Sequence, residues 1–115
     1  MGNPLVHFEF AGRNGDTLER FYGGLFDWQL NRTEAGGFPY GRIDTGGPVD
    51  GAVRHEPEGH AEVVMYFGVD DLDGAVARAE RLGGKVRIPP METPDVTFAL
   101  ISDPEGNPVG LVKNK

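Results

Sequence analysis

Residues 102–111 read Ser-Asp-Pro-Glu-Gly-Asn-Pro-Val-Gly-Leu, and apolar runs flank this stretch on both sides. An Asp at the first position of a turn bonds back to the backbone, a Pro at the second presets φ, and a Gly supplies a φ that other residues avoid. The stretch therefore predicts a hairpin between two strands, residues 96–101 and 108–113. Such a hairpin fixes strand register, and register decides which side chains face inward.

The first strand is predicted at residues 5–10. Its side chains alternate, so that the apolar ones share one face while His7 and Glu9 share the other. A helix is predicted next, with Asp16 as its N-cap and Glu19, three residues on, as the capping-box partner. The polar face of the strand at residues 5–10 thus carries His7 and Glu9, which a ligand could contact.

The predicted helix ends near Asp27, because its apolar residues recur at the spacing of one helical face: Leu18, Phe21, Tyr22, Leu25 and Phe26. Three short strands are predicted after it, at residues 29–34, 38–44 and 51–55. A turn at Gly36-Gly37 and another at residues 46–48 separate them. Residues 56–61 have the composition of a linker, with Pro, Gly and charged side chains.

The same order of elements then begins again. Residues 63–69 are apolar on both faces, which predicts a well buried strand. Asp70-Asp71 offers a helix cap, and a stripe of apolar side chains follows at Leu72, Ala75, Val76, Ala79 and Leu82. Gly83-Gly84 predicts the end of this helix. A strand at residues 85–88, broken by Pro89-Pro90, leads to the closing hairpin.

This repeat predicts an α+β protein made of two βαβββ modules, about residues 4–56 and about residues 62–115, within one domain. Each helix would cover the outer face of its sheet, so that two curled mixed sheets line a shared cleft with their inner faces. That interior is either a filled core or a wet pocket. Polar candidates for the inner positions favour the pocket: His7, Glu9, Tyr40, Arg42 and His55.

The composition excludes several functions. The chain of 115 residues has no Cys, which excludes disulfides, thiolate metal sites and a thiol nucleophile. Its formal net charge of −7 argues against nucleic acid and an anionic membrane as partners. The sequence also has no signal run and no apolar segment of membrane-spanning length. We therefore expect a soluble, cytoplasmic protein.

Three stretches together resemble the vicinal-oxygen-chelate superfamily, which includes glyoxalase I, the extradiol dioxygenases, and the fosfomycin- and bleomycin-resistance proteins. They are residues 16–28 (DTLERFYGGLFDW), residues 69–76 with 82–86 (VDDLDGAV and LGGKV), and residues 103–111 (DPEGNPVGL). The resemblance covers nearly the whole chain and implies the fold. It does not imply one activity, because this fold hosts several chemistries.

The resemblance also implies positions for a metal held by two His and one Glu. His7 matches the first position, whereas the other two fall on Val64 and Gly110, which cannot ligate a metal. Because a cation normally needs three or four protein ligands, we expect no cofactor. The alternative is a divalent metal in a non-standard site built from His7, Glu9 and His55. If no metal is bound, Glu9 would need a partner such as Arg42.

Three functions remain open at this point. The first is a binding protein for a small molecule, with polar contacts from His7, Glu9 and Arg42 and an apolar wall from Tyr66, Phe98 and Leu100. The second is a metal-dependent lyase or dioxygenase using the non-standard ligands. The third is a structural or regulatory dimer with a filled interior. In each case the resemblance implies a homodimer.

Overall fold

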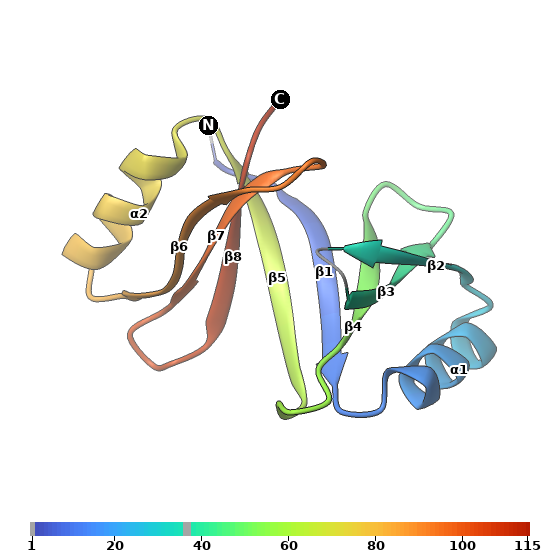
Figure 1. Cartoon of the computed structure of the whole chain (residues 1–115). Coiled ribbons are helices and arrows are strands. Elements are labelled where there is room, and N and C mark those ends of the chain that lie inside the picture. The colour runs from blue at the N-terminus through green and yellow to red at the C-terminus, as the bar shows by residue number, and fades with distance from the viewer. Residues whose placement is uncertain (1, 36–37) are drawn as a thin grey trace. The chain divides into compact units, whose positions relative to one another are not determined.

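The order strand, helix, three strands occurs twice along the chain, as the repeat predicts (Figure 1). The structure is a computed structural model that describes residues 2–35 and 38–115. Its mixed sheets and two helices confirm the α+β class. Two compact units make up the chain, one formed by His7–Val64 and the other by Met65–Lys115 with the N-terminal residues up to Val6.

In the His7–Val64 unit the strands lie in the order β2-β3-β4-β1. The bounds are β1 Leu5–Gly12, α1 Gly15–Phe26, β2 Gln29–Ala35, β3 Phe38–Asp44 and β4 Asp50–His55. β1 pairs with β4 in parallel, whereas the other two pairings are antiparallel. The sheet is therefore mixed. The turn predicted at Gly36-Gly37 lies outside the described residues.

The start of α1 corrects one prediction. Asn14 is the N-cap, because its side chain accepts a hydrogen bond from the backbone N–H of Thr17 at 3.1 Å. Asp16 instead forms an ion pair with Arg32. Both residue types cap helices well, so the sequence pattern placed the cap two residues too late. The end of the helix is as predicted, with Asp27 in the left-handed conformation at φ 56°.

α1 packs on its sheet through aromatic rings. Tyr22 stacks on Phe10 with 4.1 Å between ring centroids, and Trp28 lies 5.6 Å from Phe8. Only part of the predicted apolar stripe takes part in this packing. Its other large side chains are about half exposed: Phe21, Leu25 and Phe26.

The second unit has the strand order β5-β8-β7-β6, with α2 packed against β6, β7 and β8 (Figure 1). The bounds are β5 Glu62–Val69, α2 Leu72–Arg81, β6 Lys85–Glu92, β7 Thr97–Ser102 and β8 Pro108–Lys113. Asp71 caps α2 as predicted, with its side chain accepting from the N–H of Gly74. The core beneath α2 consists of Val69, Leu72, Val76, Ala99, Ile101 and Leu111.

β6 corrects a second prediction. The prolines at 89 and 90 do not end the strand, which continues to Glu92. The pairing with β7 shifts register between Val86 and Ile88, and again between Ile88 and Met91. Proline is tolerated here because β6 is the outermost strand of its sheet, where some backbone N–H groups have no strand to bond.

The closing hairpin forms as the sequence predicts, with Ser102 opposite Pro108. The Asp103 carboxylate accepts hydrogen bonds from the backbone N–H groups of Glu105 and Asn107, each at 2.9 Å. It also accepts one from the Asn107 amide at 2.8 Å. Gly106 has φ 96°, the conformation that favours glycine. These bonds lower the pKa of Asp103, with the Asn107 side chain as the largest cause.

Asp103→Ala is expected to lower the urea concentration at the midpoint of unfolding, because turn N–H groups lose their acceptor and the hairpin loses its preset geometry. Urea denaturation at pH 7 measures the change. Glu105→Ala in the same turn is the control and should shift stability by less than about 0.5 kcal/mol. Equal effects of the two substitutions would contradict the role given to Asp103.

Candidate polar site on the sheet of residues 7–64

The sheet of the His7–Val64 unit presents a polar face on the side opposite α1. Register places Glu9 beside Ala52 and Ala52 beside Arg42, in one row across three strands. The adjacent row contains Arg54 and Tyr40. Because side chains alternate along a strand, these residues share one face. The structure therefore brings two of the predicted polar residues, Glu9 and Arg42, into one row.

Glu9 is the centre of this face and is only 4% exposed. Its Oε2 accepts a hydrogen bond from the Tyr40 hydroxyl at 2.6 Å, and its Oε1 accepts one from Arg54 Nη1 at 2.6 Å. A buried carboxylate needs such partners, because removal from water disfavours its charge. Arg54 is therefore a partner of Glu9, whereas the predicted partner was Arg42. The alternation of β4 contains a signal for Arg54, which shares a face with Ala52 rather than with His55.

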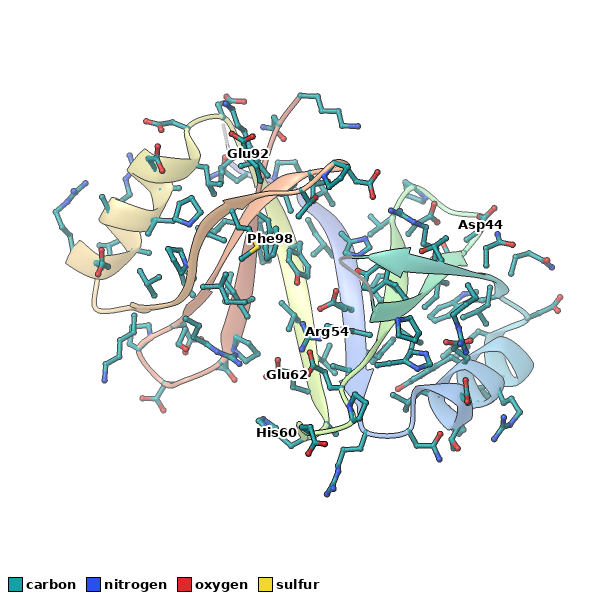
Figure 2. The ribbon with its side chains drawn as sticks, viewed as in Figure 1. Asp44, Arg54, His60, Glu62, Glu92 and Phe98 are labelled. Carbon is teal, nitrogen blue, oxygen red and sulfur yellow. The ribbon has the colours of Figure 1, made fainter. Side chains whose placement is uncertain are left out.

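Arg54 joins Glu9 to the segment that follows β4. Its Nη2 donates to Glu62 Oε2 at 2.8 Å, and its Nε lies 2.9 Å from Glu56 Oε1. Figure 2 shows Arg54 next to Glu62, with His60 beyond them in the connection to β5. Three carboxylates thus surround one guanidinium whose side chain is 23% exposed. The linker is held to the polar face by these ion pairs.

His7 extends the network at its other end. Its Nε2 lies 3.1 Å from the Tyr40 hydroxyl oxygen. The hydroxyl has one proton, which it donates to the Glu9 carboxylate, so His7 Nε2 carries the proton that reaches Tyr40. Burial lowers the pKa of His7, and this effect exceeds the opposing influence of Glu9. His7 is therefore a neutral donor to Tyr40 at pH 7.

The lowered pKa of His7 predicts a loss of stability in acid. The unfolded chain takes up this proton near 6.5, above the pKa of the folded state. The stability contributed by neutral His7 is thus complete above pH 6.5 and is lost as the pH falls through the folded pKa. His7→Gln should flatten the decline in unfolding midpoint between pH 7 and 5. His60→Gln, on an 81% exposed side chain, is the control and should keep the wild-type decline.

His55 lies on the other face of the sheet, toward α1, and the structure does not bring it to His7 and Glu9. Its Nε2 is 2.5 Å from Glu19 Oε2. Arg32 is paired with the same Glu19 and with Asp16. His7, Glu9 and His55 therefore do not come together, so this fold does not form the alternative metal site built from these three residues.

A different set of donors meets around His55. Asp16, Glu19 and His55 each offer one ligand atom, and these atoms lie within 4.8 Å of one another. Arg32 already forms ion pairs with both carboxylates, and its hydrogen bond lowers the pKa of Asp16. A divalent cation would have to compete with this guanidinium. The arrangement is accounted for as an ion-pair cluster that fixes α1 to β2 and β4.

The positions that the resemblance assigns to metal ligands do not fit a metal here. Val64 is fully buried and has no donor atom. Gly110 pairs with Tyr66 on the neighbouring strand, and the Tyr66 ring lies over it. A Cβ added to Gly110 would stand 2.1 Å from Tyr66 Cδ2. The aromatic ring thus occupies the space into which a ligating side chain at position 110 would project.

The three predicted wall residues share one face of the second sheet. Register places Leu100 beside Gly110 and Gly110 beside Tyr66, while Phe98 is two residues from Leu100 on the same strand. This face is opposite the α2 core, which takes Ala99 and Ile101 from the same strand. Leu100 is 2% exposed and Tyr66 is 7% exposed, so Phe98 is the most accessible of the three.

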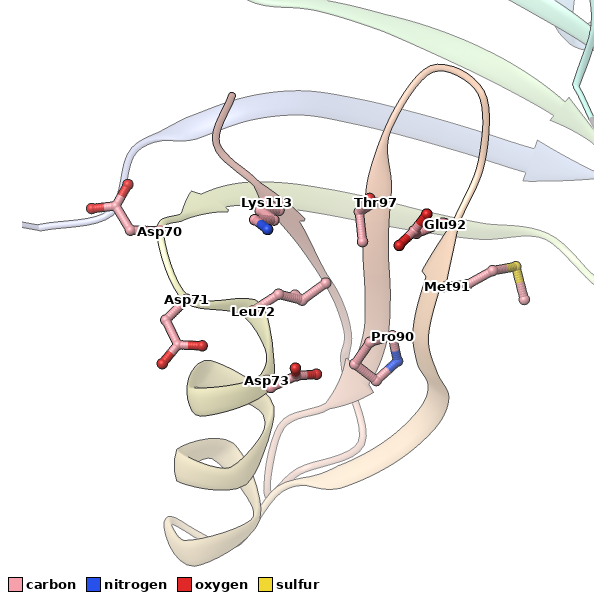
Figure 3. A pocket seen from close by; sticks show the side chains of 9 residues that line it. All are labelled: Asp70, Asp71, Leu72, Asp73, Pro90, Met91, Glu92, Thr97 and Lys113. Carbon is pink, nitrogen blue, oxygen red and sulfur yellow. The ribbon is translucent and has the colours of Figure 1, made fainter.

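The second unit also has a surface cavity of about 460 Å³ at the N-terminal end of α2, which contains none of the predicted site residues (Figure 3). Its wall includes Asp71, which caps the helix, and Asp70, which accepts a hydrogen bond from Asn114. Asp73, Glu92 and Lys113 complete its charged lining. These side chains are exposed, and the cavity is best described as a surface depression beside a helix cap.

Comparison with known proteins identifies the family of this chain. Residues 7–112 match the family described as Glyoxalase-like domain. The chain belongs to the glyoxalase-like domain family. This confirms the resemblance that the three sequence stretches carry.

Curated relatives of this glyoxalase-like chain match it over a short stretch. The protein named "Putative glyoxylase CFP32", from Mycobacterium bovis and from Mycobacterium tuberculosis, is 46% identical over 43 residues in each case. These residues are 36% of this chain and 16% of the relative. The chain therefore matches a small part of a longer protein.

Solved structures support the fold of the glyoxalase-like chain over its whole length. The hypothetical protein BH1468 from Bacillus halodurans has a TM-score of 0.78 at 13% identity, covering 100% of this chain and 96% of that one. A methylmalonyl-CoA epimerase from Streptomyces coelicolor, in complex with 2-nitronate-propionyl-CoA, has a TM-score of 0.71 at 16% identity and covers 96% of each chain. At these identities the likeness shows the fold alone.

Proposed function

We propose that this glyoxalase-like protein is a cytoplasmic homodimer that binds a small molecule on the polar face of residues 7–64, without a metal at the family's ligand positions. The observation that carries the proposal is the chain of hydrogen bonds from His7 through Tyr40 to the buried Glu9 and on to Arg54. In binding sites, a small number of precisely placed polar groups fixes the orientation of the ligand. Val64 and Gly110 argue against the metal chemistry.

The network gives the proposed site a defined chemistry. Tyr40 is held between a neutral imidazole and a carboxylate, so its hydroxyl has a fixed orientation. Arg42, in the same row as Glu9, adds a positive charge to the face. A small molecule with a carboxylate group matches the positive charge of Arg42. Tyr66, Phe98 and Leu100 remain the proposed apolar contacts, with Phe98 as the accessible one.

The names of relatives guide the choice of test compounds. Structures similar to this one include an epimerase that carries a CoA derivative. Thiol conjugates and CoA thioesters are therefore the first compounds to test, followed by aromatic metabolites. The acidic net charge supports a small molecule rather than nucleic acid as partner. Among the described residues, no helix has the length and apolar composition needed to cross a membrane.

The metal-dependent lyase or dioxygenase stays as the second candidate because of one observation, the Asp16, Glu19 and His55 donor set. A metal there would lie on the face toward α1, away from the polar network. Elemental analysis of protein purified without a metal-affinity tag separates the two candidates. Stoichiometric Zn, Ni, Mn or Fe that is lost in His55→Ala and is required for ligand binding would favour the metal-dependent function.

Calorimetric titration of the chelator-treated protein tests the proposed function. Compounds that raise the unfolding temperature in a first screen are titrated into wild type, Tyr40→Phe, His7→Gln and the control His60→Gln. We expect Tyr40→Phe and His7→Gln to weaken binding about tenfold or more, because each removes a hydrogen bond that holds the polar face in its fixed arrangement. Unchanged affinity in both variants, or binding only after metal is restored, would contradict the proposal.

A further inference from the structure

Helix α1 carries an apolar surface that its own sheet leaves uncovered. Phe21 is 56% exposed and Leu25 is 59% exposed, although both are large apolar side chains. They are four residues apart, so they are neighbours on one side of the helix. On the side toward the sheet, Tyr22 stacks on Phe10. α1 thus has a second apolar side in addition to the one that packs on its own sheet.

Gly24 lies beside these two side chains on the helix surface and leaves room for a close neighbour. A Cβ added to Gly24 would have no atom within 4 Å. A helix without a side chain at this point can approach another helix closely, because the distance between packed helices depends on the side chains at the contact. Phe21, Gly24 and Leu25 therefore form a surface with two apolar projections and a gap beside them. We call it the α1 surface.

We propose that the α1 surface is where two copies of this chain meet, with the two α1 helices antiparallel across a two-fold axis. The axis would pass near Gly23. Phe21 lies two residues before Gly23 and Leu25 lies two residues after it, so each phenylalanine meets the leucine of the second copy. A two-fold contact requires one self-complementary surface, and this helix meets that requirement.

Charge fixes the antiparallel direction. Arg20 lies three residues before Gly23, and Asp27 lies four residues after it, both exposed. In an antiparallel pair about Gly23, Arg20 lies opposite Phe26 of the second copy, which is the residue before Asp27. A parallel pair would place Arg20 beside Arg20 and Asp27 beside Asp27. Like charges opposed in this way disfavour the parallel arrangement.

The size of the α1 surface sets the expected strength of the dimer. α1 has 12 residues, which gives a length of about 18 Å. A contact made by one such helix is at the small end of specific interfaces, so the expected dissociation constant is about 1–100 µM. The inference rests on the homodimer of the proposed function, but it does not depend on ligand binding.

Sedimentation velocity over a concentration series from about 0.5 to 300 µM is the test, since it brackets the expected range of dissociation constants. Wild type should pass from monomer to dimer. Phe21→Gln with Leu25→Gln should weaken the dimer by at least about tenfold, because the two apolar contacts are lost. The matched control is Leu82→Gln, at a 73% exposed leucine of the other unit, and should associate like wild type.

A charge exchange tests the antiparallel direction independently of the apolar contacts. Arg20→Asp alone should weaken the dimer, and Arg20→Asp combined with Asp27→Arg should restore it, with circular dichroism confirming that each variant is folded. A monomer at every concentration would overturn both the homodimer and this surface. If the dissociation constant of the dimer is unchanged by Phe21→Gln with Leu25→Gln and by the charge exchange, the α1 surface is not the interface, but the homodimer remains.

Discussion

Arg54→Ala is expected to lower the free energy of unfolding by about 3 kcal/mol or more, a large part of the 5–15 kcal/mol that a domain typically has. The substitution removes the guanidinium that Glu9 contacts at 2.6 Å. Glu9 is 4% exposed, so its charge would stay away from water after losing the cation that contacts its Oε1. Glu62 and Glu56 would lose their shared cation as well.

Urea denaturation of three further variants shows whether the buried charge causes the loss. Glu9→Gln combined with Arg54→Ala should be more stable than Arg54→Ala alone, since a neutral amide costs less to bury than a carboxylate. Arg13→Ala is the control at an exposed arginine and should change stability by less than about 0.5 kcal/mol. If the Glu9→Gln addition gives no recovery, the buried carboxylate is not the source of the effect.

Gly110→Ala is the second substitution with a large expected effect, about 2–3 kcal/mol of destabilisation. The new methyl group would need the place of the Tyr66 ring, whose nearest atoms stand at 2.1 and 2.4 Å from the added Cβ. Tyr66 is 7% exposed and has little room to move away. Gly47→Ala is the matched control, because the nearest atom to its added Cβ is Thr45 Oγ1 at 3.5 Å.

A double-mutant cycle assigns this cost to the ring. Tyr66→Ala should itself destabilise the protein by about 3 kcal/mol through the cavity it leaves. In that background, Gly110→Ala should cost less than about 0.5 kcal/mol, so the coupling between the two positions is most of the original loss. Additive effects would mean that something other than the ring opposes the methyl group.

Most of the fold followed from local patterns in the sequence. Alternation in β1 separated His7 and Glu9 from the apolar face, and the turn residues of 103–107 located the last hairpin. These features depend on neighbouring residues, so the sequence contains them directly. The choice between Asn14 and Asp16 as the cap failed because both positions carry a residue that caps helices.

The site was harder to predict because it depends on register between strands that are far apart in the sequence. The parallel pairing of β1 with β4 sets Glu9 beside Ala52, which places Arg54 on the polar face and His55 on the other. A shift of one residue would have reversed them. No turn joins β1 directly to β4, so no local signal fixes this pairing. The apolar packing of Val53, which is fully buried, decides it instead.

Pro89 and Pro90 also affect whether β6 can pair with a strand from another molecule. An outermost strand presents backbone groups that can recruit a strand from another molecule, which is the first step of aggregation. Two consecutive residues without N–H groups, together with two register shifts, interrupt that pattern at the outer side of β6. These features disfavour the addition of a further strand at this edge of the sheet. Specific association is then expected at other surfaces, such as the α1 surface.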